Sequence, residues 1–152
     1  FGSLPSGYDH KYVYSHIGYN LKATDIQAAI GCAQMDRLDG FTAARKRNHA
    51  FLSQALAGYS DRLVLPKATE GADPSWFAFV LTVAQGAGFS RDELLAHLQS
   101  RKVETRNLFS GNLLRHPGFC DIEHRVVGDL RNADRITSDI FFIGVYQGLS
   151  AP

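Results

Sequence analysis

Apolar side chains recur at three- and four-residue steps over positions 26–44, the spacing of one face of an α-helix. Thr24 followed by Gln27 is a capping box, so we expect this helix to begin there. The helical pattern runs to about Ala57, where Gly58 is a good C-terminal stop. Gly40 interrupts it, because glycine costs about 1 kcal/mol in a helix interior. We therefore expect one long helix with a kink at Gly40, or two nearly collinear helices.

After Gly58 the apolar runs become shorter and typical of strands. The clearest is 76–84, which is aromatic and β-branched, with apolar residues on both faces. The remaining expected elements are strands at 62–65, 103–106 and 140–145, helices at 91–101 and 132–139, and a packed loop at 107–119. A second capping box, Ser90 with Glu93, opens the helix at 91. This order predicts an α+β fold: a long N-terminal helix and a small sheet covered by helices on one face.

The chain has 152 residues, which is the length of one ordinary domain. Hydrophobic residues make up 45% and charged residues 20%, which excludes disordered, collagen-like and coiled-coil chains. No apolar run reaches the roughly 18–20 residues that span a bilayer, and the first residues do not form a signal peptide. The first residue is Phe1 and not Met, so we expect the chain to begin inside a longer protein. Because it has only two cysteines and no C-x-x-C motif, we expect a cytoplasmic location.

Charge and motifs exclude several functions. The net charge of +1 creates no general attraction for nucleic acid or for an anionic membrane. None of the six histidines has a metal-binding spacing, so we expect no metal site. His49 and His97 are expected to be exposed or half-buried, and His16, in a tyrosine-rich loop, is the best histidine candidate for a site. The two cysteines lack a C-x-x-C spacing and are expected to be free thiols, with a single disulfide left open.

One segment carries more specific information. Residues 18–35 read Gly-Tyr-Asn, then Lys22, Asp25, Gln27-Ala28-Ala29 and Gln34-Met35. This pattern resembles the DegT/DnrJ/StrS-type sugar aminotransferases, which are fold-type I pyridoxal-phosphate proteins. Three further segments resemble the family in the same order: 75–79, 103–106 and 145–149. The resemblance implies that this chain is only the C-terminal portion of such a protein, with its small domain.

A narrower resemblance points to one branch of the family. Residues 7–12, 105–113 and 125–130 are similar to the CDP-4-keto-6-deoxyglucose 3-dehydrases, which make 3,6-dideoxyhexoses for lipopolysaccharide O-antigen. The aminotransferases usually have His where Phe77 stands and Y-x-P-L-H at 108–114. The chain lacks both, which favours the dehydrase over a nucleotide-sugar aminotransferase. A non-catalytic dimerisation or binding fragment stays open as a third reading.

The family fold divides the chain into three parts. Residues 1–23 would form a loop at the active site and dimer interface, 24–57 a linking helix or helix pair, and 58–152 the small domain. The catalytic His, which replaces the Schiff-base Lys of the aminotransferases, would lie upstream, as would the cysteines that hold a 2Fe-2S centre. Cys32 and Cys120 do not match those ligands. No catalytic residue is therefore expected in this chain.

The resemblance also assigns roles to residues that are present. Asn20 would donate its amide to the cofactor phosphate of the neighbouring subunit in a homodimer. Phe77 would pack near the active site and exclude water, unless it is a core aromatic. The remaining substrate candidates are Arg106 and Asn112, followed by Lys22 and His16. For each of them, a purely structural role without substrate contact is an equal alternative.

The implied chemistry uses pyridoxamine phosphate as an amine and electron sink, positioned by the protein. The substrate would be a CDP-linked 4-keto-6-deoxy sugar that loses its C3 hydroxyl. The 2Fe-2S centre and a partner reductase would supply electrons. Whether the upstream base is His or Lys separates the dehydrase from the aminotransferase, and this sequence does not contain it.

Overall fold

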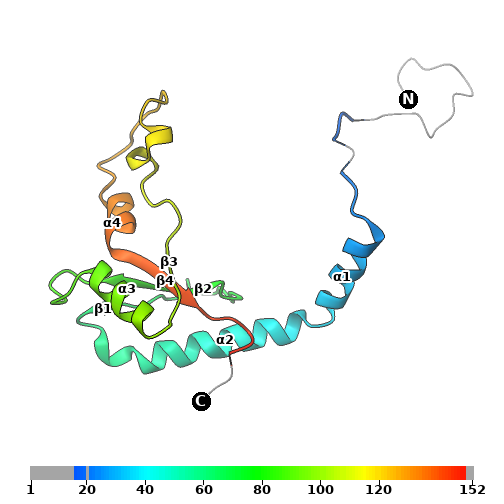
Figure 1. Ribbon diagram of the computed structural model, residues 1–152, viewed down its shortest axis with the longest axis horizontal. Coiled ribbons are helices and arrows are strands. Elements are labelled where there is room, and N and C mark those ends of the chain that lie inside the picture. Colours follow the sequence, from blue (N-terminus) through cyan, green and yellow to red (C-terminus); the bar gives the residue numbers. More distant parts are fainter. Residues whose placement is uncertain (1–15, 20, 150–152) are drawn as a thin grey trace, which may run out of the picture. The chain divides into compact units, whose positions relative to one another are not determined.

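The computed structural model describes residues 16–19 and 21–149, which belong to two compact units, Phe1–Arg37 and Leu38–Pro152 (Figure 1). The described part of the first unit contains helix α1 (Asp25–Met35). Its predicted capping box is confirmed: the Gln27 N–H donates to Thr24 Oγ1 at 3.3 Å, and the Thr24 N–H donates to Gln27 Oε1 at 2.9 Å. The expected division at 23 and 57 stays a prediction.

The second unit begins with helix α2 (Leu38–Ala55). The stretch therefore forms two helices, as one of the two predicted alternatives has it, but the break lies at Asp36–Arg37, and its predicted position at Gly40 is wrong. Gly40 lies in the first turn of α2, where backbone N–H groups have no partner inside the helix and glycine is less disruptive than in the interior. The break is instead a tightened turn, in which the Arg37 N–H donates to the Gln34 carbonyl at 3.1 Å.

A four-stranded sheet follows, with the order β1-β2-β4-β3 and antiparallel pairing throughout. Its strands are β1 (Leu63–Val64), β2 (Ala78–Val83), β3 (Thr105–Asn107) and β4 (Ile140–Gly144). Each predicted strand is present, shortened or shifted by one to three residues. Helices α3 (Arg91–Ser100) and α4 (Arg131–Asp139) confirm the two predicted helices, and α3 begins with the predicted capping box at Ser90.

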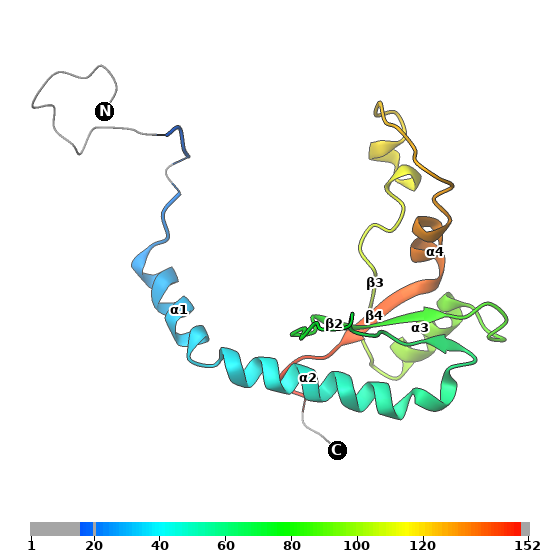
Figure 2. The ribbon, with the colours of Figure 1, turned by 180° about the vertical axis from the view of Figure 1, so that it is seen from behind.

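One face of the sheet forms the core. Phe79 on β2 and Phe141 on β4 are fully buried there, together with Val145 just after β4. Leucines pack against this cluster from α2 (Leu52), from the residue after α2 (Leu56) and from α3 (Leu94, Leu95 and Leu98). Both helices lie close to the strands in the two opposite views (Figures 1 and 2). The predicted α+β architecture, a small sheet covered by helices, is confirmed.

The loop expected to pack at 107–119 does so only in part. It contains two single-turn helices, η3 (Leu113–Arg115) and η4 (Pro117–Phe119). Leu108 and Leu114 are half-buried, whereas Phe109 is exposed. Large apolar residues in a short segment therefore do not all reach the core.

His49 on α2 is more buried than expected, because it is only 6% exposed. Its ring stacks on Trp76 with 3.7 Å between the ring centroids, and it lies 4.8 Å from the ring of Phe79. Its Nδ1 lies 3.5 Å from Ser53 Oγ, and its buried Nε2 has no hydrogen-bond partner. Burial lowers the pKa of His49, since a charged imidazolium is poorly solvated there.

Candidate functional site

The face of the sheet opposite the core carries two of the predicted site residues, Phe77 and Arg106. Phe142 on β4 pairs with Val80 on β2 and with Arg106 on β3. Directly paired residues of antiparallel strands direct their side chains to the same face. Phe142 follows Phe141, which faces the core, so these three side chains lie on the other face.

Two further rings complete this surface, which we call the aromatic face: Phe77, Val80, Arg106, Phe109 and Phe142. The Phe77 ring lies 5.8 Å from Phe142 and 6.5 Å from Phe109, and Phe109 lies 6.2 Å from Phe142, all between centroids. These are ordinary spacings for interacting aromatic pairs. Phe142 is 8% exposed, but Phe77 and Phe109 are 72% and 75% exposed. Exposed, grouped apolar side chains of this kind mark ligand or partner sites.

The backbone explains why these rings point away from the core. Phe79 belongs to the core cluster and Trp76 packs against it, so the side chains do not alternate regularly before β2. The Phe77 ring reaches Phe142 instead. Phe77 is therefore not a core aromatic. Phe109 follows β3 with a φ of +50°, and its N–H donates to the Asn107 carbonyl at 2.7 Å. Sequence reasoning missed Phe109, because nothing in the sequence marks a phenylalanine for this left-handed conformation.

Arg106 offers a cationic group beside the rings. Its side chain is 69% exposed, and its Nε and one terminal nitrogen donate to Glu104 Oε1 at 3.2 and 2.9 Å. An exposed ion pair of this type contributes only about 0–1 kcal/mol. The guanidinium can therefore exchange Glu104 for a phosphate group, which it binds with two parallel hydrogen bonds.

Asn112 differs from these residues because it is buried, with 5% exposure. Its Oδ1 accepts the Leu114 N–H at 3.1 Å, and its Nδ2 donates to Asp134 at 2.7 Å. The polar atoms of Asn112 are thus bonded within the chain. Its contact with a substrate stays a prediction.

The remaining predicted residues belong to the first unit. His16 and Lys22 are exposed and precede α1. Asn20, the predicted cofactor contact, lies outside the described residues. The roles proposed for these three residues therefore stay predictions.

The described residues do not fit a complete pyridoxal-phosphate site. Lys22, Lys67 and Lys102 are exposed, and Lys46 is paired with Asp73 at 2.6 Å, so none lies in a buried pocket that could hold the cofactor aldehyde. Across positions 16–19 and 21–149, no three His, Cys, Asp or Glu side chains are grouped as metal ligands. Over the same positions, no helix is both long and apolar enough to cross a membrane.

Comparison with known proteins shows to which family the chain belongs. Residues 1–151 match the DegT/DnrJ/EryC1/StrS aminotransferase family. The lipopolysaccharide biosynthesis protein RfbH of Salmonella typhimurium is 52% identical over 149 residues, which are 98% of this chain and 34% of RfbH. The dTDP-4-dehydro-2,6-dideoxy-D-glucose 3-dehydratase of Saccharopolyspora spinosa is 47% identical over 149 residues, 98% of this chain and 32% of that enzyme. The chain thus spans about a third of the length of these relatives.

A solved structure shows the same fold. The E. coli GDP-4-keto-6-deoxy-D-mannose-3-dehydratase with bound hydrated PLP superposes with a TM-score of 0.80 at 23% identity. The superposition covers 93% of this chain and 36% of that structure.

Proposed function

Since the chain belongs to the DegT/DnrJ/EryC1/StrS aminotransferase family, we propose that it is the C-terminal portion of a sugar 3-dehydrase that uses pyridoxamine phosphate. The observation that carries this proposal is the 47% identity, over 149 residues, with a nucleotide-sugar 3-dehydratase. The substrate would be a CDP-linked 4-keto-6-deoxy hexose on the route to the 3,6-dideoxyhexoses of O-antigen. The choice of CDP follows from the sequence resemblance alone, because that relative acts on a dTDP sugar.

The part of this chain in the reaction is to bind the substrate. Phe77 and Phe109 would pack against its apolar surface and exclude water from one side of the sugar nucleotide. Arg106 would bind oxygens of the diphosphate in place of Glu104. His16, Lys22 and Asn112 are proposed as further substrate contacts, with less support from the described geometry.

The cofactor would be bound mainly outside this chain. Pyridoxamine phosphate supplies an amine for the C4 ketone and a ring that accepts electrons. In the proposed homodimer, Asn20 would contact the cofactor phosphate of the neighbouring subunit. The catalytic His, the 2Fe-2S centre and the contact with a reductase would lie in the remainder of the protein.

The test is to incubate the whole protein, loaded with pyridoxamine phosphate, with CDP-4-keto-6-deoxyglucose and a reductase with its reduced donor. We expect the C3 hydroxyl to leave as water, and two electrons and two protons to give a 3-deoxy sugar nucleotide, seen by mass spectrometry. A product that carries an amine in place of the ketone, formed with glutamate, would instead establish an aminotransferase. No turnover and no binding of the cofactor would leave the non-catalytic fragment as the explanation.

A further inference from the structure

The segment that carries Phe109 is fixed at both ends. On one side, Asn107 pairs with Phe141 at the end of β3. Four residues later, Gly111 begins a contact with α4. The position of Phe109 over Phe142 therefore depends on two anchors, of which only the first belongs to the sheet.

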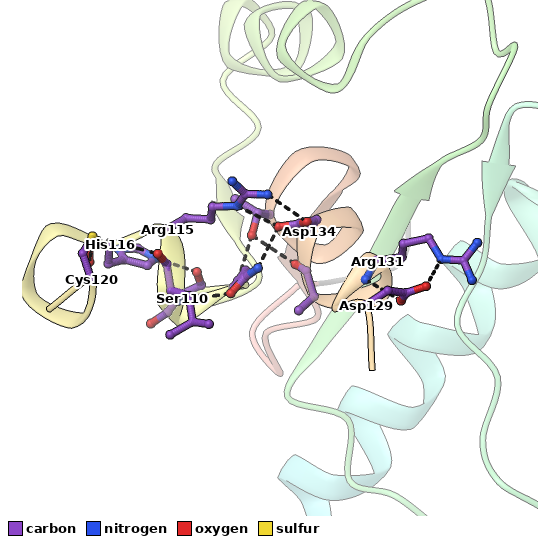
Figure 3. Close-up of polar contacts among 11 residues, drawn as sticks. Ser110, Arg115, His116, Cys120, Asp129, Arg131 and Asp134 are labelled. Atoms are coloured by element: carbon purple, nitrogen blue, oxygen red, sulfur yellow. Dashed lines mark hydrogen bonds and ion pairs between the residues drawn. The ribbon is translucent and has the colours of Figure 1, made fainter. Parts of the chain in front are cut away.

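The second anchor is a set of hydrogen bonds that we call the Asp134 cluster: Asn112, Arg115, Asp134 and Thr137. The Asn112 N–H donates to Thr137 Oγ1 at 2.8 Å, and its Nδ2 donates to Asp134 Oδ1 at 2.7 Å. Arg115 donates through Nε to Oδ1 and through a terminal nitrogen to Oδ2 of Asp134, both at 3.0 Å (Figure 3). One carboxylate of α4 thus holds two residues of the preceding loop.

Close packing supports the same anchor. Gly111 has a φ of +58°, and a Cβ built on it would lie 2.3 Å from Thr137 Oγ1. The loop therefore reaches α4 at a distance that only glycine allows. Arg115 first and Asn112 second lower the pKa of Asp134, so the carboxylate is charged at neutral pH and its hydrogen bonds are charge-assisted.

We propose that Asp134 is a positioning residue for substrate binding: through Asn112 and Arg115 it fixes where Phe109 lies on the aromatic face. This inference rests on the proposed function, because it takes the aromatic face as the substrate surface. It also gives Asn112 a positioning role beside the substrate contact proposed for it. Asp134 acts through Phe109 and does not touch the substrate itself.

The test is a double-mutant cycle in the whole protein. Asp134→Ala should raise KM for the sugar nucleotide about tenfold and change kcat little, since it disturbs a binding surface. In a Phe109→Ala background the same substitution should raise KM less than twofold, because its effect passes through Phe109. In a Phe77→Ala background the tenfold effect should remain. An equal increase in KM in the wild-type and Phe109→Ala backgrounds would overturn the proposal.

Two variants control for general damage. Asp129→Ala removes a neighbouring ion pair, with Arg131 at the start of α4, and should leave KM unchanged. Asp134→Asn keeps one carbonyl acceptor for Asn112 but loses the charge, so its KM should lie between those of the wild type and Asp134→Ala. A KM for Asp129→Ala as high as that for Asp134→Ala would also count against the proposal.

A measurement without turnover separates this inference from the proposed function. Hydrogen exchange of the backbone amides at 109–112 should become at least about tenfold faster in Asp134→Ala, while α3 is unaffected. If the wild-type protein does not turn over the sugar nucleotide, the proposed function fails whatever the variants do. Unchanged exchange at 109–112 would overturn the positioning role in either case.

Discussion

The two faces of the sheet carry the same aromatic residue in different surroundings. Phe79 and Phe141 face α2 and α3 and are fully buried. Phe77 and Phe109, on the aromatic face, are about three-quarters exposed. Phe141 and Phe142 are consecutive, so one step along β4 moves a ring from one face to the other. The core rings therefore contribute to the stability of the fold, and the exposed rings are available to bind a ligand.

The largest change in the free energy of unfolding should come from replacing a core ring with alanine, and a ring on the aromatic face is the comparison. Phe79→Ala removes a fully buried ring and should lower the free energy of unfolding by about 3–5 kcal/mol. Phe77→Ala should lower it by less than about 1 kcal/mol, because the ring is mostly in water already. Urea unfolding, followed by the fluorescence of the single tryptophan Trp76, measures both. Equal losses would mean that both faces are core.

The next largest change in stability concerns the loop that carries Phe109 and Gly111. Gly111→Ala should cost about 1–2 kcal/mol for its left-handed backbone, and the overlap with Thr137 should add to this. Gly86→Ala is the matched control, since Gly86 has a φ of +80° and nothing within 4 Å of its built Cβ. The difference in unfolding free energy between the two variants measures the close contact with α4. If the two losses are the same, that contact is not tight.

A smaller, pH-dependent effect belongs to the core face. Burial lowers the pKa of His49 from its usual 6.5, so the unfolded chain binds this proton at higher pH than the folded chain. The stability should be complete above about pH 6.5 and decline as the pH falls toward the lowered pKa. In His49→Phe this part of the decline should be absent. Urea midpoints between pH 7.5 and 5 test it, and parallel curves for both proteins would contradict it.

The smallest effect on stability should come from Arg106. Arg106→Ala breaks only an exposed pair with Glu104 and should change the unfolding free energy by less than about 1 kcal/mol. In the whole protein it should weaken binding of the sugar nucleotide at least about tenfold, since a charged contact to phosphate is lost. Glu104→Gln is the control, because it frees the guanidinium and should not weaken binding. Titration calorimetry distinguishes these outcomes.

Local rules predicted the features that depend on neighbouring residues. The capping boxes at Thr24 and Ser90 are confirmed because each needs only a side chain and a backbone N–H three positions away. The strand at 76–84 is confirmed because aromatic and β-branched residues favour extended backbone. The family resemblance depends on short motifs that occur in the same order along the chain. The family match over residues 1–151 confirms this resemblance.

Features that depend on distant contacts were not predictable. Phe77 and Phe79 are the same amino acid, but Phe77 is exposed and Phe79 is buried, because packing against α2 and α3 decides which ring is buried. Asp134 was not recognised, since its partner Asn112 lies 22 positions away and no motif joins them. His49 was expected near the surface, but stacking on Trp76 compensates for the burial of its ring.

The composition of β4 has a consequence for how this sheet assembles. Ile140, Phe141, Phe142 and Ile143 are apolar on both faces, so a slip of the strand by one residue would still place a phenyl ring and an isoleucine on each side. The strand's own sequence thus encodes its register weakly. Helix α4 leads into β4 without an intervening loop and is tied to the preceding segment through Asp134. The helix therefore sets the alignment of the strand, and a chain in which α4 fails to dock would be prone to mispaired sheets.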